Sequence, residues 1–304
     1  MVYLKLLLTA IFWGGTFIAG RTIAGDVGPY SAAFLRFTVA SIFLLVFVRR
    51  MEGRLPRLGR GQILPVVALG LTGVFAYNVF FFKGLHLIEA GRASLIIACN
   101  PIFISLLSAL LFKEKLNAVR ISGILVSVSG AIVVITRGRL SALLDGSLGS
   151  GELFIFGCVA SWVAYSLLGK TVMNRLSALS AVCYSSMIGG ALLFFPACAE
   201  GLFHDAWYYS LKDWISLFYL GFFGTVLGFV WYYQGIQRIG PMKSSLFINF
   251  VPVSAILLAY GLLDEPITWS LLMGAVLVGS GVYLTNVGAF AFPGRSARRQ
   301  DASP

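Results

Sequence analysis

Two tryptophans stand in the middle of long apolar stretches, where an indole has little water to bond. Trp13 and Trp162 are these residues, whereas tryptophans of membrane proteins concentrate at the two interfaces with water. A buried indole N–H needs an acceptor or a water-lined cavity. At helical spacing Tyr165 shares a face with Trp162, and Tyr77 and Phe81 form a second aromatic pair. These rings predict a cavity for flat or apolar groups; the alternative is a tight crossing of packed helices.

A polar face follows on a later stretch. Ser245, Asn249 and Pro252 recur at spacings of four and three, so a helix would place them on one side. Pro252 and its counterpart Pro101 stand mid-stretch, where proline removes a helical hydrogen bond and frees a carbonyl. Interrupted helices at the bilayer midplane are typical of binding sites. We expect Ser245 and Asn249 to contact a ligand and the prolines to act in gating; alternatively, Ser and Asn bond a neighbouring helix.

The ionisable residues limit what such a cavity could bind. None of the 12 Asp and Glu residues falls at the centre of an apolar stretch, where a site for polycations would want a carboxylate. Arg36 is the one cation well inside a stretch. It could attract a carboxylate, but we expect its charged head to snorkel to the interface. A neutral or zwitterionic ligand is favoured.

Enzyme chemistry is disfavoured. His86 and His204 lie in separate loops without a nucleophile constellation, and neither a Walker A loop nor an HExxH motif occurs. No metal site, cofactor or disulfide framework is predicted, because the cysteines form no CxxC pair and have no neighbouring His or Cys ligands. The cysteines are Cys99, Cys158, Cys183 and Cys198.

The composition indicates where these residues must lie. Hydrophobic residues make up 58% of the 304 and charged residues 12%, with a mean hydropathy of +0.88. Soluble domains carry about 25% charged residues, so the chain predicts an all-α membrane protein. Apolar runs of about 20 residues can cross a bilayer as helices. Ten such runs cover 4–24, 31–48, 63–84, 92–112, 118–136, 151–172, 178–198, 213–235, 243–263 and 267–288.

The net charge of +11 favours an orientation in the membrane over a nucleic-acid partner. Nucleic-acid binding would need basic residues interleaved with exposed aromatic residues on a soluble face, whereas these cations occur between apolar runs. With a cytoplasmic N-terminus, 16 of the 23 Lys and Arg residues face the cytoplasm and six face the other side. The positive-inside rule then predicts that both termini are cytoplasmic.

The chain also contains an internal repeat. FWGGTFIAGR at 12–21 aligns with SWVAYSLLGK at 161–170, an offset of 149. Because each copy would hold five helices, an odd number, the second would enter the membrane from the opposite side, as inverted repeats do. We expect repeats over 1–148 and 149–288 and a cytoplasmic tail over 289–304. An offset of 151 pairs Gly73 with Gly224, Gly84 with Gly235, Pro101 with Pro252 and Glu114 with Glu265.

These residues resemble the EamA type of the drug/metabolite transporter superfamily. The resemblance rests on the two five-helix halves, a Trp-Gly in the first helix, FKEKL at 112–116, LDEPIT at 263–268, and equal Pro-to-Glu spacing in both halves. It covers about residues 4 to 288. The aromatic-rich ten-helix pattern is most similar to YddG-like exporters of aromatic and other amino acids. The family implies export of small metabolites through a central cavity without ATP.

We therefore expect a secondary transporter of the plasma or bacterial inner membrane that exports neutral or aromatic amino acids by alternating access. Its partners would be a small-molecule substrate and the lipid bilayer. A drug or nucleotide-sugar carrier is the alternative within the superfamily, and a channel or a non-transporting scaffold is the alternative of another class. The expected substrate-binding residues are Trp13, Tyr77, Phe81, Trp162, Tyr165, Ser245 and Asn249, with Pro101 and Pro252 as gating residues.

Overall fold

The computed structural model describes residues 1–112, 118–136, 138 and 149–290, and every regular element within them is a helix. The expectation of an all-α protein is confirmed for this part of the chain. The predicted tail lies outside it from residue 291 onward. The first half contains α1 (Val2–Ile23), α2 (Pro29–Met51), α3 (Arg60–Leu69), η1 (Gly70–Ala76), α4 (Tyr77–Leu87), α5 (Ala90–Ile97), α6 (Asn100–Phe112) and α7 (Ala118–Ile135). The second half contains α9 (Ser150–Val172), α10 (Ala178–Glu200), α11 (Leu202–Asp205), α12 (Leu211–Tyr219), η2 (Leu220–Leu227), α13 (Gly228–Ser245), η3 (Leu246–Asn249), α14 (Phe250–Leu263) and α15 (Trp269–Phe290).

Six of the predicted spans are helices long and apolar enough to cross a membrane. They are α1, α2, the helix over Arg60–Leu87, α9, α10 and the helix over Leu211–Pro241. The other four predicted spans correspond to shorter apolar helices, over Ala90–Ile104, Ile121–Val134, Phe247–Leu263 and Trp269–Gly281. Length and composition thus support six spans, and the count of ten in an inverted arrangement stays a prediction.

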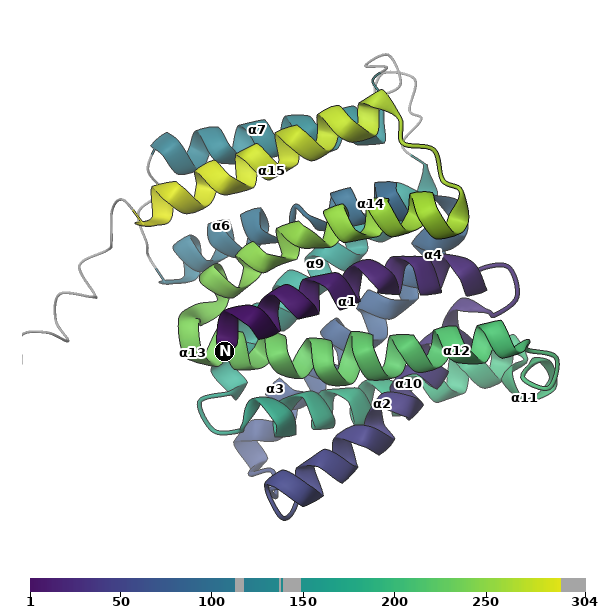
Figure 1. The fold of residues 1–304 in the computed structure, drawn as a ribbon. Coiled ribbons are helices and arrows are strands. Elements are labelled where there is room, and N and C mark those ends of the chain that lie inside the picture. The colour runs from purple at the N-terminus through teal and green to yellow at the C-terminus, as the bar shows by residue number, and fades with distance from the viewer. Residues whose placement is uncertain (113–117, 137, 139–148, 291–304) are drawn as a thin grey trace, which may run out of the picture.

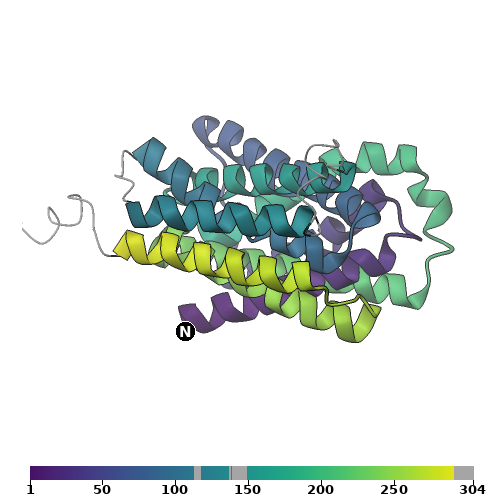
Figure 2. The same cartoon turned by 90° about the horizontal axis from the view of Figure 1, so that it is seen from above.

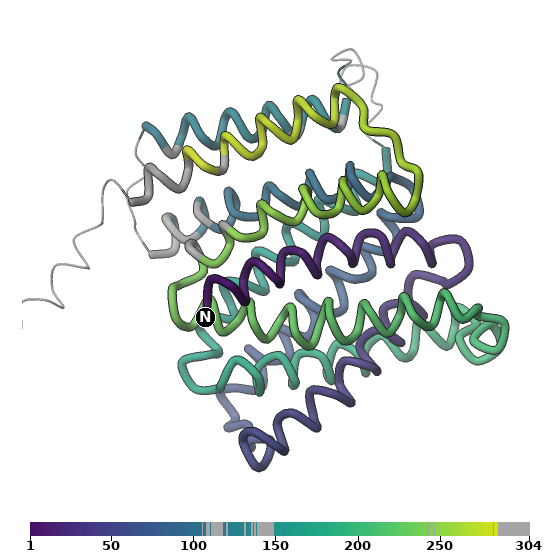
Figure 3. Tube along the Cα trace, in the orientation of Figure 1, coloured from purple at the N-terminus to yellow at the C-terminus, as the bar shows by residue number. Residues whose placement is uncertain are grey.

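Helices of the first half pack against helices of the second half. α2 lies along α10, α7 along α15 and α4 along α9 (Figure 1). The Cα trace in Figure 3 shows α1 between α13 and α14, in agreement with its contacts. Seen from above in Figure 2, the long helices lie roughly along one common axis. The main apolar core includes Phe17 and Phe37 of the first half and Trp162 and Phe229 of the second, so a central site draws on both halves.

The third helix of each half contains a π-helical segment. η1 separates α3 from α4, and η2 separates α12 from α13. The two segments occupy equivalent positions in the repeat, because Gly73 in η1 aligns with Gly224 in η2. A π turn replaces i→i−4 hydrogen bonds by i→i−5 bonds and is frequent at functional sites. Backbone carbonyls near these turns are therefore candidates for bonds to side chains.

The fourth helix of each half is interrupted. α5 ends at Ile97 and α6 begins at Asn100, while the 3₁₀ turn η3 precedes α14. Pro101 and Pro252 stand in the first turn of the helix that follows each interruption, where a missing N–H removes no helical bond. The predicted interruptions are thus confirmed, and each lies just before its proline.

Carboxylates stabilise the ends of the paired helices α2 and α10. Glu200, the last residue of α10, accepts a hydrogen bond from the backbone N–H of Ser31 in the first turn of α2, at 2.7 Å. Glu52, just after α2, accepts bonds from the hydroxyls of Ser177 at 2.5 Å and Ser180 at 2.6 Å, where α10 begins. The first turn of a helix has unpaired N–H groups and a partial positive charge. Each helix of the pair therefore ends on a carboxylate that holds the beginning of the other.

Substitution of two adjacent glycines on α10 can test how closely this helix approaches η1. A Cβ on Gly189 would lie 2.3 Å from Cβ of Val74 and 2.8 Å from the carbonyl oxygen of Gly70, whereas a Cβ on Gly190 would meet Phe37 at 3.5 Å. We expect Gly189→Ala to lower the stability of the purified protein by about 1 to 3 kcal/mol, the range for overpacking. Gly190→Ala, the control, should leave the melting temperature nearly unchanged. Equal melting temperatures for the two variants would contradict the close approach.

Candidate functional site

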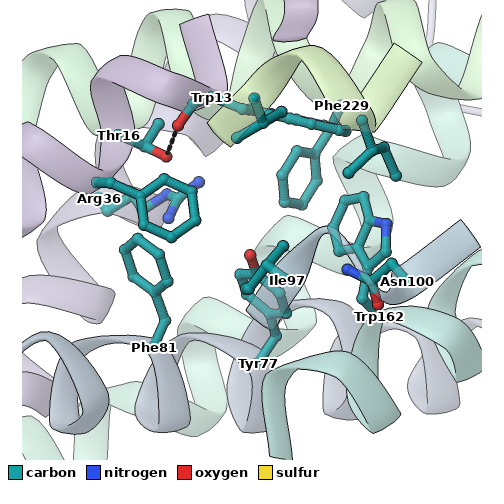
Figure 4. A pocket seen from close by; sticks show the side chains of 12 residues that line it. Trp13, Thr16, Arg36, Tyr77, Phe81, Ile97, Asn100, Trp162 and Phe229 are labelled. Atoms are coloured by element: carbon teal, nitrogen blue, oxygen red, sulfur yellow. Dashed lines mark hydrogen bonds between the residues drawn. The ribbon is translucent and has the colours of Figure 1, made fainter. Parts of the chain in front are cut away.

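A small cavity lies between the first helices of the two halves and their interrupted fourth helices. Side chains from α1, α2, α4, α9 and α13 line it together with residues at both interruptions, so both halves contribute. Figure 4 shows these side chains converging on the cavity. The lining residues are Trp13, Thr16, Phe17, Arg36, Tyr77, Phe81, Ile97, Asn100, Trp162, Phe229, Ile248 and Val251.

Aromatic rings dominate the lining. The ring of Trp162 contacts three other rings of the lining, with centroid distances of 5.2 Å to Trp13, 5.3 Å to Tyr77 and 5.1 Å to Phe229. Tyr77 in turn stacks on Phe81 at 5.9 Å. Tilted and edge-to-face pairs at such distances attract one another. The rings therefore hold each other in place and offer a largely apolar surface to the cavity.

The two central indoles differ in their hydrogen bonding. Trp13 Nε1 donates to the carbonyl oxygen of Gly224 at 2.9 Å, so the segment η2 supplies the acceptor that a buried indole needs. Trp162 Nε1 is buried and has no hydrogen-bond partner among the described residues. The same is true of Oδ1 of Asn100. A buried polar atom left unpaired costs about 1 to 3 kcal/mol, and both atoms belong to residues that line the cavity.

Arg36 lines the cavity and does not snorkel. It is 2% exposed, its Nη1 donates to Oδ1 of Asn78 at 2.8 Å, and its Nε donates to Oγ1 of Thr225 at 2.9 Å. Within the described part of the chain, no carboxylate forms an ion pair with it. The expectation that Arg36 reaches the interface is wrong, because these two side chains give the guanidinium polar partners at the centre of the molecule.

The two partners of Arg36 are themselves held by the π segments. Asn78 Nδ2 donates to the carbonyl of Val74 in η1 at 2.8 Å, and Thr225 Oγ1 donates to the carbonyl of Leu220 in η2 at 3.1 Å. The guanidinium is thus connected to the third helix of each half. Asn78 and Thr225 were not predicted, although a polar residue inside each of the apolar runs 63–84 and 213–235 was a usable signal.

Four of the predicted substrate-binding residues line the cavity and three do not. Tyr165 lies outside the lining, and its hydroxyl is 3.2 Å from Oγ of Ser185. Ser245 is buried, and Asn249 ends the turn η3 directly after Ile248, which does line the cavity. Ligand contact by any of the seven stays a prediction. The four that line it are Trp13, Tyr77, Phe81 and Trp162.

Asn100 and Phe229 are among the lining residues that the sequence pattern did not identify. Asn100 directly precedes Pro101, so its place at a predicted interruption could have identified it. Phe229 is one of 25 phenylalanines, and no local pattern distinguishes it from the rest. Such a residue is found only once the helices are packed.

The cavity is contracted around its own side chains. The centre of a water molecule can occupy ≈ 20 Å³ of it, roughly enough for one ordered water. A molecule the size of an amino acid requires the lining rings to separate. The lining side chains therefore lie close together, with space between them for about one water molecule.

Known proteins resemble the chain over nearly its whole length. The sequence profile of the EamA-like transporter family matches residues 1–136 and again residues 149–287. The uncharacterized transporter YyaM of Bacillus subtilis is 30% identical over 99% of this chain and 98% of its own. A probable terminal-alkyne amino-acid exporter of Streptantibioticus cattleyicolor is 31% identical and covers 92% of each chain. A probable amino-acid metabolite efflux pump of Escherichia coli is 27% identical over 93% of each chain.

A solved crystal structure shares the fold. It aligns with a TM-score of 0.65 over 92% of this chain and 98% of its own, at 20% identity. The apolar helices and the transporter relatives together make the chain a multi-pass membrane protein. It belongs to the EamA-like transporter family of the drug/metabolite transporter superfamily.

Proposed function

We propose that this protein is a secondary transporter that exports neutral amino acids, above all aromatic and apolar ones, by alternating access. The observation that carries the proposal is the central cavity, where rings from both halves surround polar atoms without partners. Rings can hold an apolar side chain, while polar atoms replace part of the hydration of its charged ends. The two relatives named as amino-acid or amino-acid metabolite exporters support the same substrate class.

The transport mechanism requires two five-helix halves of opposite orientation, over residues 1–148 and 149–288. The family profile matches once within each half, which supports this division. Each half also has a π segment in its third helix and an interruption in its fourth, and equivalent helices pair, α2 with α10 and α7 with α15. Inverted repeats can exchange conformations, and this exchange opens a central site to one side of the membrane and then to the other.

Gating is assigned to the two interruptions. Pro101 and Pro252 directly follow Asn100 and Val251, both of which line the cavity. Bending at either interruption would therefore move the lining itself. Helices bend at prolines and at breaks in the hydrogen-bond ladder more readily than elsewhere. Opening at one interruption and closing at the other would give a substrate access from one side at a time.

Two alternative functions have less support. A carrier of nucleotide sugars would need several cations at its cavity, and Arg36 is the one cation among the lining residues that the structure describes. A channel or scaffold differs from a carrier in kinetics. Unlabelled substrate on the far side of the membrane accelerates uptake of labelled substrate only in an alternating carrier, so a counterflow measurement separates these classes.

The first prediction concerns substrate selectivity. Proteoliposomes should take up phenylalanine, methionine and leucine faster than lysine or glutamate. Trp162→Ala should raise the half-saturation concentration of aromatic substrates about two- to tenfold, since an aromatic contact contributes about 0.5 to 1.5 kcal/mol. Trp207→Ala, at a position 88% exposed, is the control and should change nothing. Equal uptake of lysine and phenylalanine, or an unaltered half-saturation in Trp162→Ala, would refute the aromatic cavity.

The second prediction concerns gating. Pro252 lies in the first turn of α14, so its missing N–H interrupts no bond within that helix. Pro252→Ala supplies an N–H that can extend the hydrogen bonds of α14 across the interruption to the carbonyl of Ile248 in η3, and so stiffen it. Counterflow exchange should therefore slow more than equilibrium binding weakens, and Pro101→Ala should act in the same way in the other half. Pro196→Ala, inside α10 and outside the cavity lining, is the control. Wild-type exchange rates in both Pro101→Ala and Pro252→Ala would remove the prolines from the gating mechanism.

The third prediction concerns orientation in the plasma or bacterial inner membrane. Both termini are expected in the cytoplasm, because this orientation places 16 of 23 basic residues there. In a background without the four native cysteines, Arg54→Cys and Trp207→Cys place single thiols at exposed positions in loops on opposite sides. An impermeant maleimide should label position 207 in intact cells, and position 54 only after permeabilisation. The reverse pattern would invert the orientation.

A further inference from the structure

We propose that Arg36 is the anchor for the carboxylate of the substrate, so that a carboxylate, more than an ammonium, is the group a ligand must carry to bind. This inference rests on the proposed function and names the polar group that its site recognises. Arg36 lies at the wall of the central cavity, among aromatic rings (Figure 4). Its guanidinium is buried, and the described residues provide no carboxylate partner for it.

The guanidinium has unused donors in the arrangement that a carboxylate requires. Arginine has five N–H groups, and hydrogen bonds to Thr225 and Asn78 use two of them. The remaining three, one on Nη1 and both on Nη2, have no hydrogen-bond partner in the described part of the chain. Nη1 and Nη2 lie side by side and match the spacing of two carboxylate oxygens, which can accept from both at once.

Charge balance points to the same ligand. The rings of Phe37 and Phe229 lie 5.4 Å and 5.8 Å from Cζ of Arg36 and offset part of its charge. A ring quadrupole offsets less than a full opposite charge does, and a buried cation without a counter-ion is unfavourable. One carboxylate balances one guanidinium, whereas a phosphate dianion would leave an uncompensated negative charge. A monocarboxylate, or the carboxylate end of an amino acid, therefore fits this wall of the cavity best.

The anchor is held in place before a ligand arrives. Asn78 and Thr225 accept from Arg36 while they donate to backbone carbonyls of η1 and η2. Gly224 lets η2 approach α1 closely beside the guanidinium, because a Cβ there would lie 2.6 Å from Cγ2 of Thr16, whereas it would be in ordinary contact, at 3.4 Å, with Nη2 of Arg36. A donor group fixed in advance binds its ligand with a smaller loss of conformational entropy.

The side of the cavity opposite Arg36 could contact the part of the ligand that lies beyond its carboxylate. In Figure 4, Asn100 and Trp162 lie opposite Arg36, with rings between them. Oδ1 of Asn100 is an unpaired acceptor and Nε1 of Trp162 an unpaired donor. An ammonium group can donate to Oδ1 of Asn100, and an acceptor on the ligand can bond Nε1 of Trp162, but neither of these atoms carries a charge. The carboxylate is thus the group that contributes most to recognition.

Three related ligands separate the two charges of an amino acid. L-Phenylalanine has both, 3-phenylpropionate has the carboxylate alone, and 2-phenylethylamine has the ammonium alone. Binding to the purified protein can be followed by quenching of tryptophan fluorescence and by thermal stabilisation. We expect phenylalanine and phenylpropionate to bind at least about tenfold more tightly than phenylethylamine. Phenylethylamine binding as tightly as phenylpropionate would overturn the proposal, as would phenyl phosphate binding more tightly than phenylpropionate.

Substitution of Arg36 distinguishes a ligand anchor from a structural residue. Arg36→Gln should weaken both carboxylates at least about tenfold and leave phenylethylamine nearly unchanged. Arg50→Gln, at an exposed position on the same helix, is the control and should bind all three like the wild type. An equal loss for all three ligands in Arg36→Gln would indicate a structural role and overturn the anchor.

A second variant covers the case in which Arg36→Gln does not fold. Arg36→Lys keeps the charge but loses the paired donors, so the preference for carboxylate should fall without vanishing. A preference equal to that of the wild type would overturn the paired-donor anchor.

The measurements also keep this proposal apart from the proposed function. Carboxylate-dependent binding without counterflow would overturn transport and leave the anchor standing. Counterflow of phenylethylamine as fast as that of phenylalanine would overturn the anchor and leave transport standing.

Discussion

The interior of a bilayer has no water to bond a free backbone group, and the rest of this structure depends on that constraint. Helices satisfy it by bonding within themselves, so any break in the ladder must be enclosed by protein. Among the described residues, such departures from the regular ladder include the π segments η1 and η2 and the two interruptions of the fourth helices. Side chains supply the missing bonds, as when Trp13 Nε1 donates to the carbonyl of Gly224.

The same constraint explains why a cation can lie at the centre. Arg36 is stable there because Asn78 and Thr225 accept hydrogen bonds from its guanidinium. These two side chains in turn donate hydrogen bonds to backbone carbonyls of η1 and η2. This polar chain joins the third helices of the two halves through one guanidinium. If the halves exchange conformations as we propose, Arg36 would bind the ligand while it is bonded to helices that move relative to each other. A bound anion would then stabilise one arrangement of the halves over another.

Close packing around this centre uses small residues against large ones. Gly189 allows α10 to approach η1, and the ring of Tyr165 lies where a Cβ on Gly73 would be. Trp162 and its neighbouring rings then fill the cavity until about one water's volume is left. Because the rings pack against one another, no part of a ligand larger than a water molecule fits while they stay in place. Admitting a larger ligand therefore requires several rings to move together. A concerted motion of the helices that carry them would achieve this.

Local pattern was sufficient for several of these features. Hydropathy predicted the helical class, the prolines predicted where the fourth helices are interrupted, and the position of Trp13 and Trp162 in the middle of apolar runs predicted an aromatic cavity. Each depends on neighbours a few residues away. The position of Arg36 does not, because a long cationic side chain inside an apolar run can reach the interface or turn inward. Its partners Asn78 and Thr225 lie 42 and 189 positions away in the chain, so only tertiary packing could decide that the guanidinium is buried, because packing alone brings acceptors to it.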